Sequence, residues 1–358
     1  MRILLVAPSH KEVIRGAMVL VHGLARALRD HGHHVTLLQA ARPEHQTSIE
    51  EIHMEYVSTT RKSLFPLLMA LRSVRNYDVI HTHDAAGGAL ALRSRLQRLP
   101  LVCEFHAPKV HTEGFWKAGW RWRHIGLAAR NAPFILTPSR WLAGELRARY
   151  DIDQRRIHIV PSGIGDHWFD LIRASDQSAA SSPRVVLVNM KEVAVGLQAF
   201  ARLSPHYGAR LELYGMDKRL EEHIRLAREL GISERVEFCG FVPNEELPKR
   251  LVGADLLLYP TRADNFPQVL QEAGALGIPA LTAPVGGIPE IVIDGETGVH
   301  CNDLEAFSRA LEHLISNPTA RNRMAHAARK RAETWRWRFL VHQMEDPYSM
   351  VRKRKSPD

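Results

Sequence analysis

The chain has 358 residues, which is too long for one ordinary core and suits two domains. Its 45% hydrophobic and 24% charged residues are typical of a soluble globular protein and exclude a disordered or fibrous one. The net charge of +9 is uneven, because residues 1–165 carry 23 Lys and Arg against 13 Asp and Glu. No helix-turn-helix or RNA-binding motif accompanies this charge, so an acidic small substrate or an anionic lipid is favoured over nucleic acid, with a merely solvated basic surface as the alternative.

The first half of the chain predicts a parallel sheet. RILLVAP is a continuous apolar run, MVLVHGLARALRDHG follows with helical periodicity, and HVTLLQA is again strand-like. YDVIHTH, LPLVCEFH, PFILTPS and RIHIVPSG are further short strands, and each ends in His, Ser or Gly. Because ligands of open parallel sheets bind at the carboxyl ends of strands, these polar residues are expected to line a crevice.

A second alternating series follows a Ser- and Ala-rich stretch. We predict a first domain over residues 1–168, a linker over 169–183 and a second domain over 184–335. VVLVN, ARLELYG, RVEFCGF, ADLLLYP, PALTAP and GVHC are its expected strands. Residues 336–358 are expected to form a helix that returns to the first domain and ends in a basic tail.

The three cysteines, Cys103, Cys239 and Cys301, are far apart and show no metal-binding spacing. A reducing cytosol therefore suits this chain best. The first apolar run is shorter than the core of a signal peptide, and no run approaches the ~20 residues that span a bilayer. We expect a cytoplasmic protein.

The segment from Tyr259 to Gly298 carries the most specific pattern. A strand ending in ADLLLYP leads to Asp264, and FPQVLQEAGALG then starts a helix with Pro267 in its first turn. The amides of a helix start and the positive end of its dipole form an anion site. Asp264 and Glu272 are about two turns apart and suit sugar hydroxyls, although a capping Asp and a helix-surface Glu would give the same spacing.

This segment resembles the donor-binding region of glycosyltransferase family 4, and the resemblance extends over nearly the whole chain. The family frame is EGFGxxxxEAxAxGxPV followed by GGxxE, and here it is DNFPQVLQEAGALGIPAL followed by GGIPE at 286–290. The resemblance implies an α/β GT-B fold, in which two Rossmann-like doubly wound domains face each other across a cleft. It also implies a retaining hexosyltransferase that needs no metal or other cofactor.

The family resemblance gives each matching residue a role. Asp264 would hold the donor hexose, and Glu272 would hold the ribose. Backbone amides around Phe266, Gln268 and Val269 would receive the diphosphate, and Gly286 and Gly287 would also belong to the donor site.

Two matches lie in the first half of the chain. Gly16 precedes LARALRDHGHHVTLL as the glycine of the family's phosphate loop does, and His106 in VCEFHAP stands where the family has a histidine beside the reacting sugar. A buried histidine with a purely structural role would look the same.

One departure from the family concerns its Arg and Lys after the first strand of the second domain. In VVLVNMKEVAVGLQAFARL, Lys191 falls on the family Lys, Glu192 replaces the following Gly and Val186 occupies the Arg position. Lys191 would then neutralise the leaving diphosphate alone, or Arg262 or a basic first-domain residue would assist it. The missing Arg charge is alternatively a sign of low activity or none. Lys191 itself is alternatively an ordinary solvated lysine at a helix start.

Other candidate metal ligands are weaker. Asp151 and Asp153 form an Asp-x-Asp but follow a helix, and His81, His83 and Asp84 end a buried strand. The run His31, Gly32, His33 and His34 lies at a turn from helix to strand and is expected on the surface. The sequence therefore predicts no metal site.

The resemblance implies transfer with retention, in which the leaving phosphate helps to deprotonate the acceptor. We expect the acceptor to be a cell-surface polysaccharide, lipopolysaccharide or glycolipid precursor. SLFPLLMALRSVR at 63–75 and FWKAGWRWRH at 115–124 combine apolar and basic residues as membrane-surface segments do, although packing between helices would explain them too. A silent scaffold subunit and a nucleotide-sugar epimerase are the rival hypotheses. The sequence does not distinguish UDP from GDP donors.

Overall fold

The computed structural model describes residues 1–7, 17–41, 52–58, 65–106, 120–171, 182–189 and 191–354. The chain forms two compact units, of which one is Met1–Gly163 with Trp337–Asp358 and the other is Ile164–Arg336. Every described strand pairing in both units is parallel. Among the described residues, no helix combines the length and the apolar character needed to cross a membrane.

The first unit contains a seven-stranded sheet in the order β3-β2-β1-β4-β5-β6-β7. Its strands are β1 (Arg2–Ala7), β2 (His34–Ala41), β3 (His53–Ser58), β4 (Val79–His83), β5 (Leu101–Glu104), β6 (Phe134–Thr137) and β7 (Ile157–Ile159). Its helices are α1 (Ala17–Asp30), α2 (Phe65–Leu71), α3 (Gly88–Gln97), α4 (Trp120–Asn131), α5 (Arg140–Tyr150) and α12 (Trp337–Lys353).

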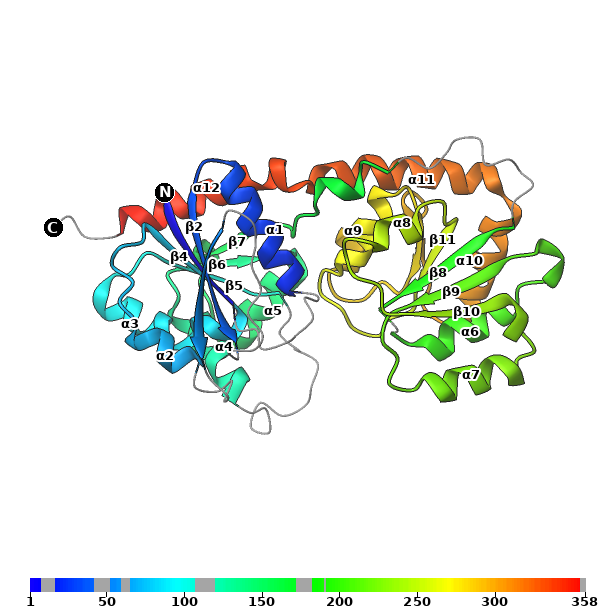
Figure 1. Cartoon of the computed structure of the whole chain (residues 1–358), viewed down its shortest axis with the longest axis horizontal. Helices are drawn as coiled ribbons and strands as arrows, with labels where there is room; N and C mark the ends of the chain where they lie inside the picture. The colour runs from blue at the N-terminus through cyan, green and yellow to red at the C-terminus, as the bar shows by residue number, and fades with distance from the viewer. Residues whose placement is uncertain are drawn as a thin grey trace. The chain divides into compact units, whose positions relative to one another are not determined.

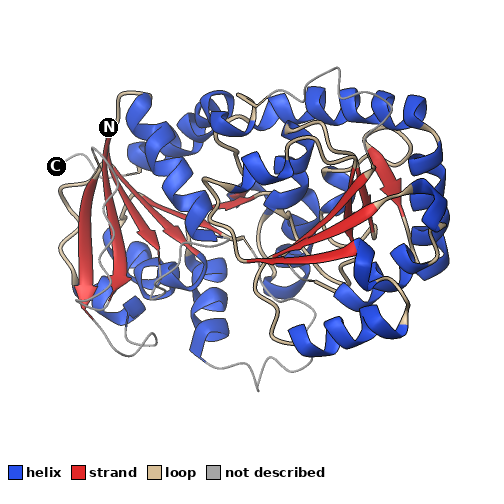
Figure 2. Ribbon diagram, turned by 45° about the vertical axis from the view of Figure 1, so that its right-hand side comes forward, coloured by secondary structure: helices blue, strands red, loops and turns tan. Residues whose placement is uncertain are grey.

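Helices cover both faces of this sheet (Figure 2). Successive residues of a strand point to opposite faces, so each strand contributes to two cores. Leu4 and Val6 of β1 belong to the core that includes residues of α2 to α5. Ile3 and Leu5 belong to the core formed with α1 and α12. In Figure 1, α12 (red) lies beside α1 (blue), in agreement with the contacts between the two helices.

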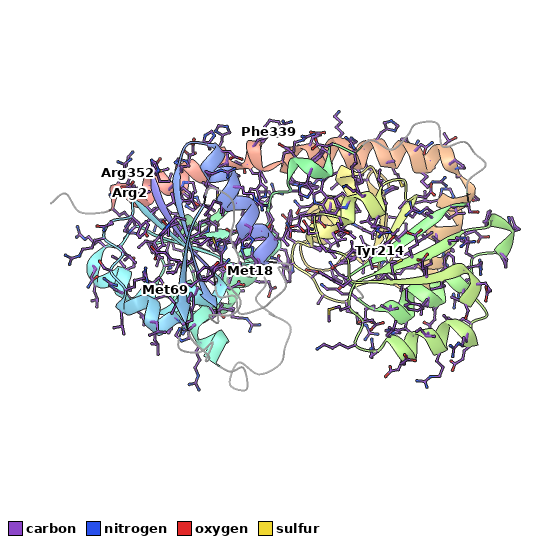
Figure 3. All side chains as sticks on the ribbon, viewed as in Figure 1. Arg2, Met18, Met69, Tyr214, Phe339 and Arg352 are labelled. Atoms are coloured by element: carbon purple, nitrogen blue, oxygen red, sulfur yellow. The ribbon has the colours of Figure 1, made fainter. Side chains whose placement is uncertain are left out.

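The last helix is amphipathic, and its inner side is part of the core of the first unit. Val341, Met344 and Tyr348 are buried there. Phe339 lies on the outer side and is 51% exposed (Figure 3). The first unit is therefore built from both ends of the chain.

The second unit has a six-stranded sheet in the order β10-β9-β8-β11-β12-β13. Its strands are β8 (Arg184–Val188), β9 (Arg210–Tyr214), β10 (Val236–Gly240), β11 (Leu256–Tyr259), β12 (Ala280–Thr282) and β13 (Gly298–His300). Its helices are α6 (Val193–Ala201), α7 (Leu220–Glu229), α8 (Leu247–Leu251), α9 (Gln268–Ala275), α10 (Leu304–Ser316) and α11 (Pro318–Ala332).

The strand order of each unit reverses direction at one point. In the first unit this is between β1 and β4, and in the second it is between β8 and β11. At such a switch point the two connections leave in opposite directions, so the carboxyl ends of the two strands border a ligand crevice. The doubly wound α/β architecture predicted from the sequence is confirmed in both units.

Two details differ from the sequence predictions. The boundary falls at Gly163 instead of residue 168, because the Ile164 amide bonds the Trp335 carbonyl at 2.9 Å and Arg336 pairs with Asp166 at 2.9 Å. The sequence pattern also did not indicate β3, whose residues HMEYVS lie at the edge of the sheet and do not form an apolar run.

Candidate functional site

Asp264 lies in the loop that follows β11, and several groups fix its carboxylate. The buried Tyr259 at the end of β11 donates its hydroxyl to Oδ2 at 2.6 Å, and the Asn265 amide donates to Oδ1 at 2.9 Å. Burial and the neighbouring Asp264 raise the pKa of Tyr259 well above its ordinary value. The phenol therefore stays protonated and remains a hydrogen-bond donor to the carboxylate.

Lys191 follows β8, the strand on the other side of the switch point, and its Nζ forms an ion pair with Asp264 Oδ2. The same Nζ lies 5.7 Å from the centre of the Tyr259 ring. The Lys191 side chain is 40% exposed, so a ligand can reach its charge. One cation and one carboxylate, 73 residues apart in sequence, thus meet at the carboxyl ends of adjacent strands.

The residue after Lys191 has an unusual backbone. Glu192 has φ +47 and is the N-cap of α6, a left-handed conformation that glycine adopts more easily. Its carboxylate pairs with Arg262 at 3.1 Å, and Arg262 is 82% exposed. A second cation therefore lies on the loop that precedes Asp264.

Gly286 allows the next loop to approach Asp264 closely. A Cβ at Gly286 would lie 1.8 Å from the Asp264 carbonyl oxygen, and its φ of +61 is left-handed. Gly287 follows and caps the short helix Ile288–Glu290. The glycine pair thus brings its own loop against the backbone of the Asp264 loop.

The start of α9 presents backbone amides without a side-chain cap. Pro267 is the N-cap itself rather than a residue of the first turn, and Gln268 and Val269 open the helix. Phe266 is buried with its ring edge-on to Trp335, at 6.3 Å between centroids. Packing thus anchors the loop, and the helix start keeps the geometry of an anion site, which carries about half a positive charge.

Glu272 lies inside α9 and is 5% exposed. Within the described part of the chain, its side chain is hydrogen-bonded only by Asn244 Nδ2, at 3.2 Å from Oε1. Burial raises the pKa of Glu272 to about 7, although the Asn244 bond acts in the opposite direction. A buried carboxylate with acceptor capacity to spare suits hydroxyl groups of a ligand.

The first unit has its own polar cluster at the carboxyl ends of β4 and β5. Glu104 Oε2 lies 3.0 Å from His81 Nε2 and 3.7 Å from His83 Nδ1, and Oε1 lies 3.6 Å from His106 Nδ1. His83 Nδ1 and His106 Nε2 share a hydrogen bond of 2.8 Å. Tyr348 of α12 completes the cluster at 2.7 Å from His81 Nδ1.

The charges of this cluster depend on one another. Burial alone would raise the pKa of Glu104, but His106, His81 and His83 outweigh it and lower the pKa to about 2. Burial lowers the pKa of His83 well below its ordinary value. One ionised carboxylate therefore orients a set of strand-end imidazoles.

The sequences and structures of known proteins bear on both units. The family described as Glycosyl transferases group 1 matches residues 185–331, and Glycosyltransferase Family 4 matches residues 14–167. The D-inositol 3-phosphate glycosyltransferase of Corynebacterium diphtheriae is 37% identical over 302 residues, which cover 76% of this chain and 70% of that protein.

The chain belongs to glycosyltransferase family 4. It is a glycosyltransferase with the GT-B fold.

Other known proteins are similar to this chain over nearly their full length. The glycogen synthase of Mycobacterium tuberculosis is 26% identical over 373 residues, covering 92% of this chain and 90% of that protein. The sucrose-phosphate synthase from Thermosynechococcus elongatus superposes with a TM-score of 0.81 at 21% identity, covering 97% and 98% of the two chains. Anabaena HepE in complex with UDP-glucose superposes with a TM-score of 0.77 at 18% sequence identity, covering 97% of this chain and 99% of that chain.

Measured against the family pattern, the structure brings Lys191, Asp264 and Gly286 together. Glu272 does not pair with these residues and is hydrogen-bonded by Asn244 instead. His106 belongs to the cluster of the first unit, and Gly16 lies outside the described residues.

The Asp-x-Asp of this glycosyltransferase lies in a surface turn. Asp151 ends α5 in a left-handed conformation, and both carboxylate oxygens of Asp153 accept from the Arg155 side chain. Val186, in place of the family Arg, is buried in β8.

Sequence reasoning missed Glu104, Tyr259, Asn244 and Tyr348. Glu104 precedes His106 by two positions at the end of a strand, where alternate residues share a side, so the period of two was an available signal. Asn244 and Tyr348 gave no comparable local signal.

Proposed function

We propose that this glycosyltransferase transfers a hexose, with retention, from a nucleotide diphosphate sugar held by its second unit. The observation that carries the proposal is Glu272, a buried carboxylate that receives only the Asn244 amide within the described part of the chain. An ion buried in this way costs stability, so a role in ligand binding explains its presence. The family resemblance assigns it to the ribose hydroxyls.

The groups around Asp264 support the next step. Asp264, oriented by Tyr259 and Lys191, would accept hexose hydroxyls, and the diphosphate would lie on the amides at the start of α9. The Lys191 side chain is partly exposed, and in the proposal it exchanges Asp264 for the diphosphate when the donor binds. Helix start and Lys191 together would supply the positive charge, and in our proposal no metal is needed.

The proposed reaction proceeds on one face of the sugar. The acceptor oxygen bonds to the anomeric carbon while the bond from that carbon to the diphosphate oxygen breaks. The acceptor's proton passes to the leaving diphosphate, so the charge balances without an enzymatic nucleophile.

The acceptor belongs to the first unit in this proposal. We favour a polysaccharide, lipopolysaccharide or glycolipid precursor at the cytoplasmic face of a membrane. Exposed leucines of the contacting helices α2 and α3, with the basic residues of that half, support the membrane contact. These leucines are Leu67, Leu68, Leu71, Leu92 and Leu96. A phosphorylated polyol, as in the name of the Corynebacterium relative, is the anionic small-molecule alternative.

Binding to vesicles tests the membrane part. The protein should bind anionic but not neutral liposomes, salt should weaken binding, and the double variant Leu71→Ser, Leu96→Ser should reduce it. Met216→Ser is the matched control, because Met216 is an exposed apolar residue of the second unit. Binding that ignores lipid charge would contradict the membrane contact.

A silent scaffold subunit is the second candidate, and the observation in its favour is Val186, which places no charge where the family has Arg. Incubating the purified protein with UDP-, GDP- and ADP-sugars distinguishes the two. Catalysis would be established if the protein hydrolyses or transfers the donor sugar and Glu272→Ala abolishes this activity. Glu296→Ala, a change at an exposed carboxylate, should preserve it. Product NMR then reads the anomeric configuration, and an inverted linkage would refute retention.

A further inference from the structure

A turn rich in histidine joins α1 to β2, and no step of the proposed reaction uses it. His31 directly follows α1, and Gly32 reverses the chain with φ +82. The turn lies beside α12, because His31 contacts Glu345 and His342 of that helix, and α1 itself is also in contact with α12 (Figure 1). This part of the first unit places two histidines and a glutamate on one exposed patch.

The ligand atoms of this patch converge. His31 Nε2 lies 3.0 Å from Glu345 Oε1, and His342 Nδ1 lies 3.8 Å from Glu345 Oε2. One suitable atom each of His31, His342 and Glu345 lies within 4.8 Å of the others. His342 and Glu345 are one helical turn apart on α12, so the helix itself fixes their separation.

These separations match those of ligands around one small ion. Bonds of about 2.1 Å at tetrahedral angles put neighbouring ligand atoms about 3.4 Å apart. The two observed distances, 3.0 Å to Glu345 Oε1 and 3.8 Å to Glu345 Oε2, lie on either side of this value. The rings of His31 and His342 are edge-on, at 86° and 4.4 Å between centroids. Such rings can direct their nitrogen lone pairs to a common point.

The buried cluster of the same unit provides a contrast. His81, His83 and Glu104 also bring one ligand atom each within 4.8 Å of the others, but the rings of His81 and His83 are stacked at 23° and 4.6 Å. His81 Nδ1 and His83 Nδ1 are already hydrogen-bonded, to Tyr348 and His106, and all three residues of this cluster are buried. The exposed patch is therefore the one that an ion can enter from solvent.

We propose that His31, His342 and Glu345 form a site for a borderline divalent ion such as Zn²⁺, which fastens α12 to the end of α1. Two imidazoles and one carboxylate select such ions over Mg²⁺ or Ca²⁺, and water completes the coordination. The three side chains are between 32% and 59% exposed, so an ion can enter from solvent.

The position of the site makes its role structural. His34, three residues after His31, pairs with Arg2 at the amino end of the sheet, whereas His83 and Glu104 lie at the carboxyl ends of their strands. Arg2 and Arg352 of α12 lie together at the same amino end (Figure 3). An ion here would hold α12 in register without reaching the reacting groups, and α12 carries Tyr348, which bonds His81.

Metal titration of the untagged full chain tests the site. Calorimetry should show that one Zn²⁺ ion binds per chain. Co²⁺ bound at the same site should give the visible absorption of a protein-bound complex, which differs from that of the hydrated ion. His342→Ala and Glu345→Gln should each weaken Zn²⁺ binding about tenfold or more. His53→Ala is the matched control, because His53 also faces a carboxylate, Glu55 at 3.5 Å, but belongs to no three-ligand group among the described residues.

Hydrogen exchange tests the fastening. Zn²⁺ should slow amide exchange in residues 337–353 of the wild type and not in the two site variants, whose metal-free melting temperatures verify that they fold. Absence of Zn²⁺ binding to the wild type, or equal loss in His53→Ala, would overturn the site. Tight binding with unchanged exchange in α12 would overturn its role as a fastener.

Discussion

Glu272 should make the unliganded protein less stable as the pH rises. Its pKa is raised by burial from 4.5 to about 7, so between these values the native state holds a proton that the unfolded chain has released. Stability therefore falls as the pH increases through this interval, and the full penalty is present above pH ~7. Glu272→Gln keeps the shape and cannot ionise, so it should remove the penalty.

The size of the effect follows from the two pKa values. Glu272→Gln should have a larger free energy of unfolding than the wild type. By linkage, this difference between the two proteins should be about 2.5 kcal/mol larger at pH ~8 than at pH ~5. Urea denaturation of both proteins at the two pH values measures it. Glu296→Gln, a change at an exposed carboxylate of the same unit, is the control and should show no such pH-dependent gain.

Donor binding provides the complementary reading. Ligand hydroxyls donate to the ionised carboxylate, so the wild type should bind its nucleotide sugar more tightly as the pH rises through ~7. Glu272→Gln should lose this dependence together with most of its affinity. A substitution that shifts stability equally at both pH values would refute the view that Glu272 is a destabilising, ligand-binding carboxylate.

Three further substitutions test other contacts. Lys191→Ala should lower kcat about 10²- to 10³-fold, as loss of a preorganised charge does, and partial recovery in Lys191→Arg would show that charge matters; an unchanged kcat would exclude Lys191 from the reaction. Gly286→Ala should abolish donor binding in calorimetry. It should also lower the stability of the protein by more than Gly295→Ala, because Gly295 has a similar φ of +73 but open space around it. Equal losses of stability in the two variants would mean that the close approach of Gly286 to Asp264 is unimportant. Glu104→Gln should lower the free energy of unfolding by about 3 kcal/mol at neutral pH, as measured by urea denaturation. This loss should shrink as the pH falls from the unfolded pKa of 4.5 toward the native pKa of about 2, because acid then protonates the wild-type carboxylate. A loss that does not depend on pH would argue against the ion pairs.

Local patterns made the sheets and the donor loop predictable. Continuous apolar runs marked the central strands, which are buried on both faces, and the spacing from Asp264 to Glu272 lies within one segment of chain. β3 escaped because HMEYVS contains no continuous apolar run. The sequence therefore identified the buried central strands and also the partly exposed edge strands β7, β10 and β13.

Partners across the fold were harder to predict. Asn244 reaches Glu272 over 28 residues, and Tyr348 reaches His81 over 267, because strand order and helix packing bring them together. No periodicity along the chain encodes such pairs. Lys191 was found through the family pattern, but its ion pair with Asp264 depends on the adjacency of β8 and β11.

The use of α12 in the first unit has a consequence for biosynthesis. A growing chain exposes all seven strands of the first sheet long before Trp337–Lys353 leaves the ribosome. During that interval the face that later receives Val341, Met344 and Tyr348 lacks its cover, while the second unit is synthesised. The second unit can thus complete its core before the first, and a chaperone would find its binding surface on the half of the protein that was made earliest.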